Sequence, residues 1–530
     1  MRSKMLVPLI AVPALALAAC TSAGSTGAGG DEGDLVDGKT FTMAIGLDPG
    51  ALDPGMTVLS AGRFLGQFIY GRLVALDEDG DAVPALAEKW EVDAGSAVFT
   101  LRDGIACEDG TALTATVVAD NINFVADPAN QSPLLGMNVQ PGTVATGDNA
   151  TGTVTVASGV PDAFLLHNLG ALPIACGNGL ADRDLLVEGK AGTGMFELVE
   201  AVANDHYTLE RRKDYTWGPG DWDPDQKGLP DEVVIRIIPN ETTAANLLIA
   251  GDVTATLVAG TEQDRLLERD FFHADLRAPA GQLHFNQSAG RPTADEEVRR
   301  ALVQAQDLAQ LRKVLVGDRG TVPTSLVTVA PDPCDVDTVD GNVPEHDVAA
   351  AEEALDAAGW TKGADGVRAR KGKRLELKMI YLTTFGETMA ATAELAQQEW
   401  KKIGVEVEIR GVDLAGLNEA LFGTGDWDIS AGQVGAALPS QLVPFFGGPT
   451  PPGGTNFAHV DNADYKALST AAAGKVGTDG CEDWAAAEEA LLEAVDVVPY
   501  ADSAYMTFAR GARFGLGDVG LDPTSIRMYE

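Results

Sequence analysis

Residues 231–253, DEVVIRIIPNETTAANLLIAGDV, contain the pattern that decides the fold. The segment DEVVIRII is rich in β-branched residues and predicts a strand, which Pro239 and Asn240 close. The next segment, ETTAANLLIAGD, predicts a helix that Gly251 ends. A strand followed by a helix is the repeating unit of an α/β fold.

The same elements recur further along the chain. ETMAATAELAQQEWKKIG (387–404) predicts a helix that Gly404 ends, and VEVEI (405–409) predicts the strand that follows it. Repetition of helix, glycine and strand predicts an α/β architecture with β-α crossovers.

Two helix starts carry capping signals. Asp347 precedes the helical pattern of DVAAAEEALDAAGW (347–360) and is expected to cap it. Thr293 to Glu296 match a capping box, ahead of a single helical pattern that runs from Val298 to Leu311.

The chain begins with an export signal. A basic start precedes an apolar run that ends at Ala19 and is too short to span a bilayer. LAAC (17–20) resembles the bacterial lipobox, in which the cysteine is acylated and becomes the new N-terminus. We expect residues 1–19 to be a lipoprotein signal peptide, Cys20 to be lipidated, and residues 20–35 to be a flexible tether. A plain secretory signal with an incidental cysteine is the alternative.

Composition limits the partners. Removal of residues 1–19 from the 530-residue chain leaves 511, enough for two or three lobes. There are 38 Lys and Arg against 78 Asp and Glu, a formal net charge of −40. Because so acidic a surface repels phosphate backbones and anionic lipid heads, we expect no nucleic-acid partner and membrane attachment through the acyl anchor only.

Four cysteines remain after Cys20. An even number in an exported chain predicts two disulfides, with three possible connectivities. Sequence order favours Cys107 with Cys176 and Cys334 with Cys481, and four separate buried thiols are the alternative. No CxxC occurs, which argues against a zinc ribbon or a thioredoxin-like motif.

Signatures of catalysis are missing from the sequence. It contains no GxSxG elbow, no HExxH and no P-loop lysine motif, and its six histidines are isolated. Gly515, Gly517 and Gly520 match GxGxxG, but only ten residues follow, too few for a dinucleotide-binding unit. We therefore expect a loop there, no cofactor or metal, and no enzymatic activity.

A series of segments extends over nearly the whole chain. The segments are, in order, GLDPGALDP (46–54), QFIYGRLVALDEDGDAVPALAEKWEV (67–92), FTLRDGIACEDGTALTATVV (99–118), GTGMFELVE (192–200), LERRKDYTWG (209–218), LPDEVVIRIIPNETTAANLLIAGDV (229–253), HFNQSAGRPTADEEVRRALVQAQD (284–307), ALDAAGW (354–360) and EWKKIGVEVEI (399–409). As an ordered set, this series resembles the peptide/nickel-type solute-binding proteins of ABC importers.

The resemblance implies an α/β, two-lobed fold of the periplasmic-binding-protein type, class II and large, with an extra subdomain inserted in lobe I. Lobe I would comprise residues 36–80, 190–280 and 500–530, the inserted subdomain residues 81–189, and lobe II residues 281–499. The chain would cross between the lobes near Ala280 and Tyr500, and these crossings would act as a hinge when the lobes close on a ligand.

The resemblance also implies a place for the ligand. In oligopeptide and dipeptide receptors of this family, an aspartate after a WDI-like strand holds the peptide amino group. In WDISAGQVGAALPSQL (427–442), Ala436 or a neighbour takes that place, and no acid follows Asp428. We expect an uncharged, capped or otherwise unusual ligand, because an unpaired buried ammonium is costly. The candidate ligand contacts are Leu47, Asp48, Asn286, Gln287, Thr384, Phe385, Gln433, Val434 and Ala436.

We therefore expect a monomeric, lipid-anchored, extracytoplasmic receptor of an ABC importer, which binds a peptide-like or other small organic ligand and docks on permease subunits. Some actinobacterial lipoproteins with this architecture serve envelope assembly as partner-binding or regulatory proteins, which is the first alternative. A secreted hydrolase is the second, and it predicts paired carboxylates with raised pKa values in the cleft.

Overall fold

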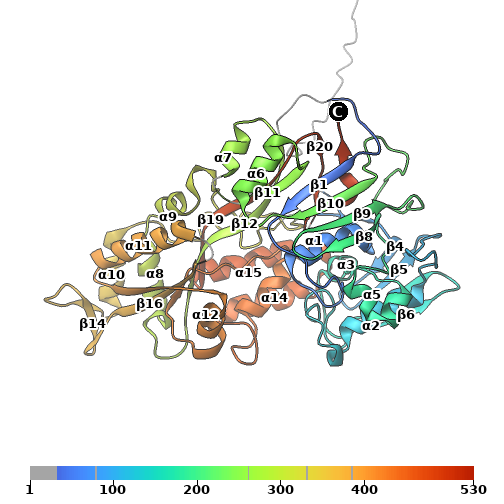
Figure 1. Cartoon of the computed structure of the whole chain (residues 1–530). Coiled ribbons are helices and arrows are strands. Elements are labelled where there is room, and N and C mark those ends of the chain that lie inside the picture. Colours follow the sequence, from blue (N-terminus) through green and yellow to red (C-terminus); the bar gives the residue numbers. More distant parts are fainter. Residues whose placement is uncertain are drawn as a thin grey trace, which may run out of the picture.

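One mixed sheet runs through the molecule and joins its two halves (Figure 1). The computed structural model describes residues 33–77, 80–258, 260, 262–329, 332–383, 386–517 and 519–530. Within these ranges the sheet has ten strands, which are in spatial order β17 (Glu406–Val412), β16 (Glu376–Leu382), β18 (Ile429–Ser430), β12 (Phe272–Phe285), β19 (Val497–Ala509), β11 (Ala255–Val258), β1 (Thr40–Ile45), β10 (Glu232–Ile237), β9 (His206–Arg211) and β8 (Phe196–Val202).

Two long strands, β12 and β19, belong to both halves of the sheet, and we call them the crossing strands. They pair antiparallel from Phe272 to His284 of β12. At one end β19 pairs with β11, and at the other end β12 pairs with β18. Their register is irregular between Pro279 and Gln282, where the sequence places the passage between the lobes. The lobe boundaries and the hinge motion stay predictions.

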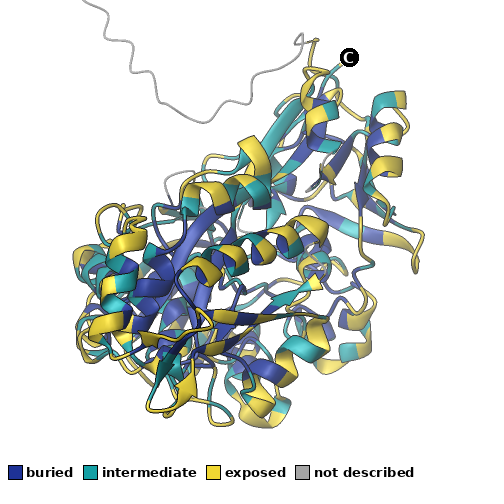
Figure 2. Ribbon diagram, turned by 90° about the vertical axis from the view of Figure 1, so that its left-hand side faces the viewer, coloured by how far each residue is buried: buried dark blue, intermediate teal, exposed yellow. Residues whose placement is uncertain are grey.

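Helices cover both faces of the sheet (Figure 1). Those on one face are α6 (Glu241–Ala250), α7 (Glu262–Leu267), α9 (Leu308–Val316) and α11 (Gly386–Lys402), and those on the other include α1 (Ser60–Ile69), α14 (Ala463–Ala473) and α15 (Cys481–Glu493). The central strands are buried, and the outer surfaces of the helices are exposed (Figure 2). Separate apolar clusters fill the halves, one around Phe41 and Ile69 and another around Trp400.

The inserted subdomain has a smaller sheet of its own. Its strands are in spatial order β4 (Ala87–Val92), β5 (Ser96–Leu101), β7 (Thr153–Ala157) and β6 (Val144–Asp148), and α2 (Ala115–Ala126) packs on them. The disulfide between Cys107 and Cys176 lies in this segment, and the disulfide between Cys334 and Cys481 lies in lobe II. Both pairings that sequence order favours are confirmed.

Residues 231–253 form the strand and the helix that the sequence predicts. Residues 232–237 are β10 and residues 241–250 are α6. The side chain of Asn240 accepts the N–H of Thr243 at 2.9 Å and caps the helix. Gly251 ends it with a φ of +84°, a conformation that glycine adopts without the strain a Cβ atom would add. Asp347 caps α10 (Val348–Ala357) as predicted, because its carboxylate accepts the N–H of Ala350 at 2.9 Å.

The predicted capping box at residues 293–296 is wrong. The Thr293 hydroxyl donates to the Asn286 carbonyl at 2.6 Å instead of capping a helix. The single helix expected after it is two helices, α8 (Glu296–Gln304) and α9. The Asp307 carboxylate accepts the N–H of Gln310 at 3.0 Å and caps the start of α9. The apolar periodicity in the sequence therefore continues although the helix is interrupted.

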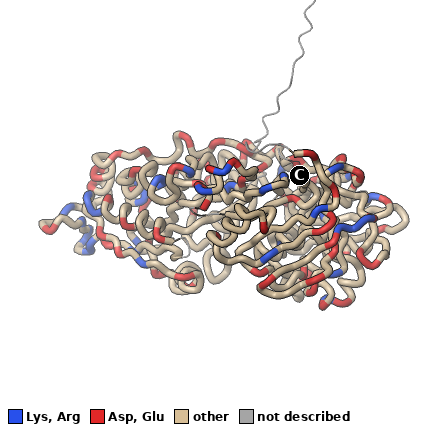
Figure 3. Tube along the Cα trace, turned by 45° about the horizontal axis from the view of Figure 1, so that its top comes forward, with Lys and Arg blue, Asp and Glu red and all other residues tan. Residues whose placement is uncertain are grey.

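Acidic residues are spread along both halves of the molecule (Figure 3). Across the described residues, we find no helix that combines the length and the apolar character needed to cross a bilayer. At the GxGxxG match, where the sequence predicts a loop, two short strands, β21 (Leu516–Gly517) and β22 (Gly520–Leu521), pair antiparallel.

Candidate functional site

The parallel strands of both lobes end at the boundary between the lobes. In lobe I, β11 runs antiparallel to β19, and β1 and β10 run parallel to β11, so all three end towards lobe II. In lobe II, β18 runs antiparallel to β12, and β16 and β17 run parallel to β18, so these three end towards lobe I. Ligands of open α/β sheets bind beyond the carboxyl ends of the strands. The candidate site is therefore the boundary beside the crossing strands.

Leu47 and Asp48 follow β1 at this boundary. The Leu47 side chain is 72% exposed, so it is available to a ligand. Burial raises the pKa of the Asp48 carboxyl, but hydrogen bonds from Asn204, Gly50 and Tyr207 together outweigh burial, and this pKa is lowered. The Tyr207 hydroxyl donates to the carboxylate at 3.0 Å. Asp48 thus ties the end of β1 to the turn between β8 and β9.

Segment 431–437 follows β18 on the other side of the boundary and contains three of the candidate contacts. The Gln433 side-chain amide donates to the Ala280 carbonyl of β12. Val434 and Ala436 are buried, and the Ala436 carbonyl accepts two N–H groups, those of Thr328 and Val329, at 3.1 Å each. The segment therefore lies against a crossing strand and is held by hydrogen bonds.

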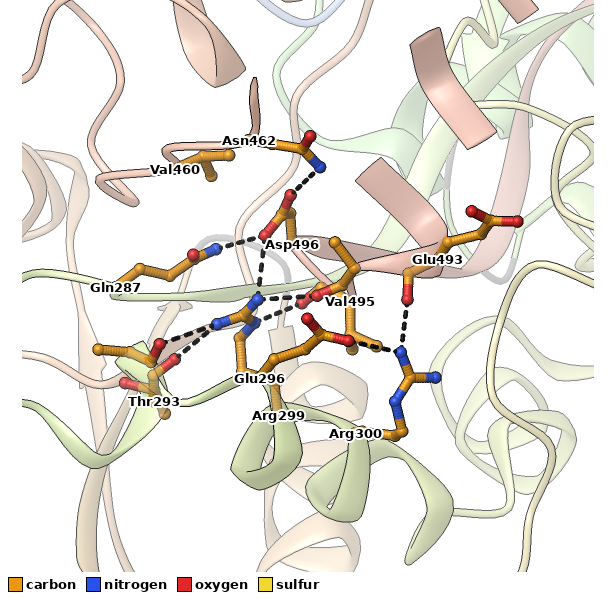
Figure 4. Close-up of polar contacts among 12 residues, drawn as sticks. Gln287, Thr293, Glu296, Arg299, Arg300, Val460, Asn462, Glu493, Val495 and Asp496 are labelled. Atoms are coloured by element: carbon orange, nitrogen blue, oxygen red, sulfur yellow. Dashed lines mark hydrogen bonds and ion pairs between the residues drawn. The ribbon is translucent and has the colours of Figure 1, made fainter. Parts of the chain in front are cut away.

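Asn286 and Gln287 follow β12, which ends at the opposite side of lobe II. The Asn286 amide donates to the Trp427 carbonyl at 3.0 Å, and the Gln287 amide donates to Asp496 at 2.9 Å. Figure 4 shows Gln287, Arg299 and Asn462 around the Asp496 carboxylate, which Arg299 contacts at 3.2 Å. Both side chains form hydrogen bonds within lobe II, and the structure does not bring them together with segment 431–437.

Three predicted residues lie outside the described residues. Thr384 and Phe385, which follow β16, are two of them, and the lipidation candidate Cys20 is the third. They stay predictions.

Gln282 is a functional candidate that sequence reasoning missed. It lies on β12 and is buried. Its amide oxygen accepts the Val434 N–H at 2.8 Å, and its amide nitrogen donates to the Val434 carbonyl at 3.2 Å. Gln282 therefore positions segment 431–437. A glutamine inside a strand gives no sequence pattern that could have identified it.

None of the candidate contacts lines the cavities found among the described residues. One of about 850 Å³ opens on lobe II between residues 322–324 and 339–345, beside Arg300 and Glu493, and none of the candidate contacts lines it. Within the described ranges, no three His, Cys, Asp or Glu side chains gather in a way that could hold a metal ion. Besides the Asp48 carboxylate, which Asn204, Gly50 and Tyr207 already contact, the groups at the boundary are apolar side chains, amides and backbone, which suit binding of an organic molecule.

Solved structures share this architecture. The ABC transporter substrate-binding protein CtaP of Listeria monocytogenes has a TM-score of 0.78 at 18% identity, with 93% of this chain and 100% of that chain covered. The two-lobed α/β fold that the sequence predicts is confirmed.

Sequence comparisons agree with the fold. Protein XP55 of Streptomyces lividans is 27% identical over 392 residues, which are 70% of this chain and 67% of that protein. The periplasmic murein peptide-binding protein MppA of Escherichia coli (strain K12) is 25% identical over 493 residues, which are 85% of each chain. The model of the family described as bacterial extracellular solute-binding proteins, family 5 Middle, matches residues 81–452. The chain therefore belongs to the family 5 bacterial extracellular solute-binding proteins.

Proposed function

We propose that this protein is the receptor subunit of an ABC importer, that lipid on Cys20 holds it outside the cell membrane, and that it binds a peptide-like or other small organic ligand between its lobes. The proposal rests on one observation: beside the crossing strands, the carboxyl ends of the parallel strands of lobe I point towards those of lobe II. A ligand at that place touches both lobes, so its binding favours the closed form. The relation to MppA, which is named for binding murein peptide, supports a peptide-like ligand.

The groups around segment 431–437 favour a ligand that is neutral where it meets this segment. Asp428 is the last acid before segment 431–437, and its carboxylate already accepts from the Arg291 side chain and from the Lys378 N–H, each at 2.8 Å. Gln433 offers an amide oxygen, and Leu47 offers an exposed apolar side chain. We infer that the ligand has no free ammonium group at this segment, because an unpaired buried charge is costly.

Thermal shift assays and native mass spectrometry test both points. The panel contains peptides with free amino termini, the same peptides with N-acetyl groups, and a broad set of metabolites. We expect one ligand per chain, no turnover, and a stabilisation of about 2.7 kcal/mol at a ligand concentration of 100 times Kd. A preference for peptides with a free amino terminus would contradict the inference of a neutral ligand and leave the receptor function unaffected. The receptor function is contradicted if no compound of the panel binds and if protein purified without refolding carries no ligand.

A role in envelope assembly also fits a site without an acid after Asp428. Crosslinking in the native cell, followed by identification of the captured membrane protein, separates the two functions. Capture of permease subunits supports import. Capture of a biosynthetic membrane enzyme in their place contradicts it.

A further inference from the structure

A second contact joins the lobes away from the crossing strands. It consists of Ala163 and Phe164 of the inserted subdomain and of Leu438, Ala472 and Trp484 of lobe II, and we call these five residues the latch. The latch lies where α3 (Leu165–Gly170) meets α14 and α15, on the face of the sheet opposite α7 and α9 (Figure 1).

The latch is closed and excludes solvent. Phe164 is 0% exposed, Trp484 is 3% exposed and Leu438 is 5% exposed. The ring centroids of Phe164 and Trp484 are 6.2 Å apart. The Gly477 N–H donates to the Ala163 carbonyl at 2.7 Å, so a backbone hydrogen bond also crosses the contact. Separation of the lobes would expose these apolar side chains to water, which is unfavourable.

The inserted subdomain holds its side of the latch in a fixed turn. The Asp162 carboxylate accepts the Phe164 N–H at 3.0 Å and the Asn168 side-chain amide at 2.9 Å. The Gln140 amide also donates to it at 3.3 Å. Asp162 is buried, so these hydrogen bonds are sheltered from water and position Phe164 towards lobe II.

Lobe II builds the other side from three stretches. The disulfide between Cys334 and Cys481 fixes the start of α15, and Trp484 lies one turn further along that helix. Ala472 lies at the end of α14. Leu438 directly follows segment 431–437, so the segment that lines the candidate site continues into the latch.

We propose that the latch holds the two lobes closed when no ligand is bound. The crossing strands connect the lobes covalently, and the latch connects them by apolar burial and the hydrogen bond between Gly477 and Ala163. A rotation about the crossing strands therefore separates Phe164 from Trp484, and the free energy of this apolar contact sets the population of the open form. The inference does not depend on the proposed function, because the measurements that test it use the chain without ligand.

Removal of the Phe164 ring tests the latch. For unliganded Phe164→Ala, we expect a larger radius of gyration in small-angle scattering. We also expect about tenfold faster hydrogen exchange of the Gly477 amide, which corresponds to ~1.4 kcal/mol. Leu438→Ala weakens the contact from lobe II and should change both readouts in the same direction. It keeps the proposal testable if the inserted subdomain does not fold without Phe164.

Phe124→Ala is the matched control. Phe124 belongs to the same subdomain, where its ring lies 3.6 Å from the Arg183 guanidinium, and it is not part of the latch. The Phe124→Ala variant should keep the wild-type radius of gyration and the wild-type exchange rate of the Gly477 amide. Phe164→Ala and Leu438→Ala proteins that fold, melt cooperatively and retain both wild-type values would overturn the proposal.

Discussion

Gln282 shows how one side chain fixes the candidate site. It bonds to both backbone polar groups of Val434, which lies 152 residues away in the sequence. Because Gln282 is buried, removal of its amide leaves both backbone groups without a partner away from bulk water. A passage of the chain between the lobes near Ala280 was expected from the sequence, but the contact of Gln282 with Val434 could not be predicted, since it depends on how β12 and β18 meet.

Gln282→Ala should destabilise the fold and weaken ligand binding. Loss of the amide leaves the Val434 N–H and carbonyl unpaired, so we expect a loss of ~2–4 kcal/mol in the free energy of unfolding in urea. Calorimetry with a ligand from the panel should show lower affinity. Gln306→Ala is the control, since Gln306 is equally buried in lobe II and donates to the Ala396 carbonyl at 3.1 Å. It should lose stability and keep its affinity, and equal affinities in the two variants would count against a positioning role for Gln282.

Asp502 gives the protein a dependence on pH. It is buried on β19 beside the irregular register, and its backbone pairs with Thr321. Burial raises the pKa of its carboxyl from 3.8 to about 7, although Arg277 opposes the shift. Between these two pKa values the folded chain keeps a proton that the unfolded chain has lost. The contribution of Asp502 to the free energy of unfolding therefore falls as the pH rises towards 7 and is constant above pH 7.

Asp502→Asn should remove this part of the pH dependence. We expect the melting temperature of the wild type to fall more between pH 5 and pH 8 than that of the variant, by roughly 2–4 °C. The difference between the two proteins isolates Asp502 from other titrating groups. Parallel melting profiles over this range would mean that its carboxyl has an ordinary pKa.

Among the helices and strands, the sequence correctly predicted those ends that depend on contacts between neighbouring residues. Gly251 ends α6 and Asp347 starts α10, because glycine geometry and a capping carboxylate act within a few residues. The capping box at Thr293 failed because a backbone carbonyl seven residues earlier, that of Asn286, takes its hydroxyl. The strand direction that puts residues 286 and 287 away from the boundary also follows from sheet pairing alone, which no local pattern encodes.

The disulfide between Cys334 and Cys481 should support both stability and the latch. Replacement of both cysteines by serine should cost ~2–5 kcal/mol in the free energy of unfolding. It should also speed exchange of the Gly477 amide, since the start of α15 loses its attachment. The matched double variant at Cys107 and Cys176 should lose stability and keep Gly477 protected. Equal exchange at Gly477 in the two double variants would show that the lobe II disulfide does not support the latch.

At the scale of the whole molecule, the family and the two-lobed fold could be predicted because the ordered series of segments extends over nearly the whole chain. The latch could not be predicted, since it brings together four stretches that have no shared pattern. The net charge of −40 is distributed over both halves (Figure 3), so like charges oppose closure, and apolar burial at the latch acts against that repulsion.

Hydrogen exchange with and without ligand shows whether a single ligand touches both lobes. The measurement compares protein that carries its ligand, as verified by native mass spectrometry, with the same protein stripped by unfolding and refolded. We expect slower exchange with ligand both in residues 46–50 of lobe I and in residues 431–438 of lobe II. Slower exchange in one lobe alone, with ligand demonstrably bound, would contradict contact of the ligand with both lobes.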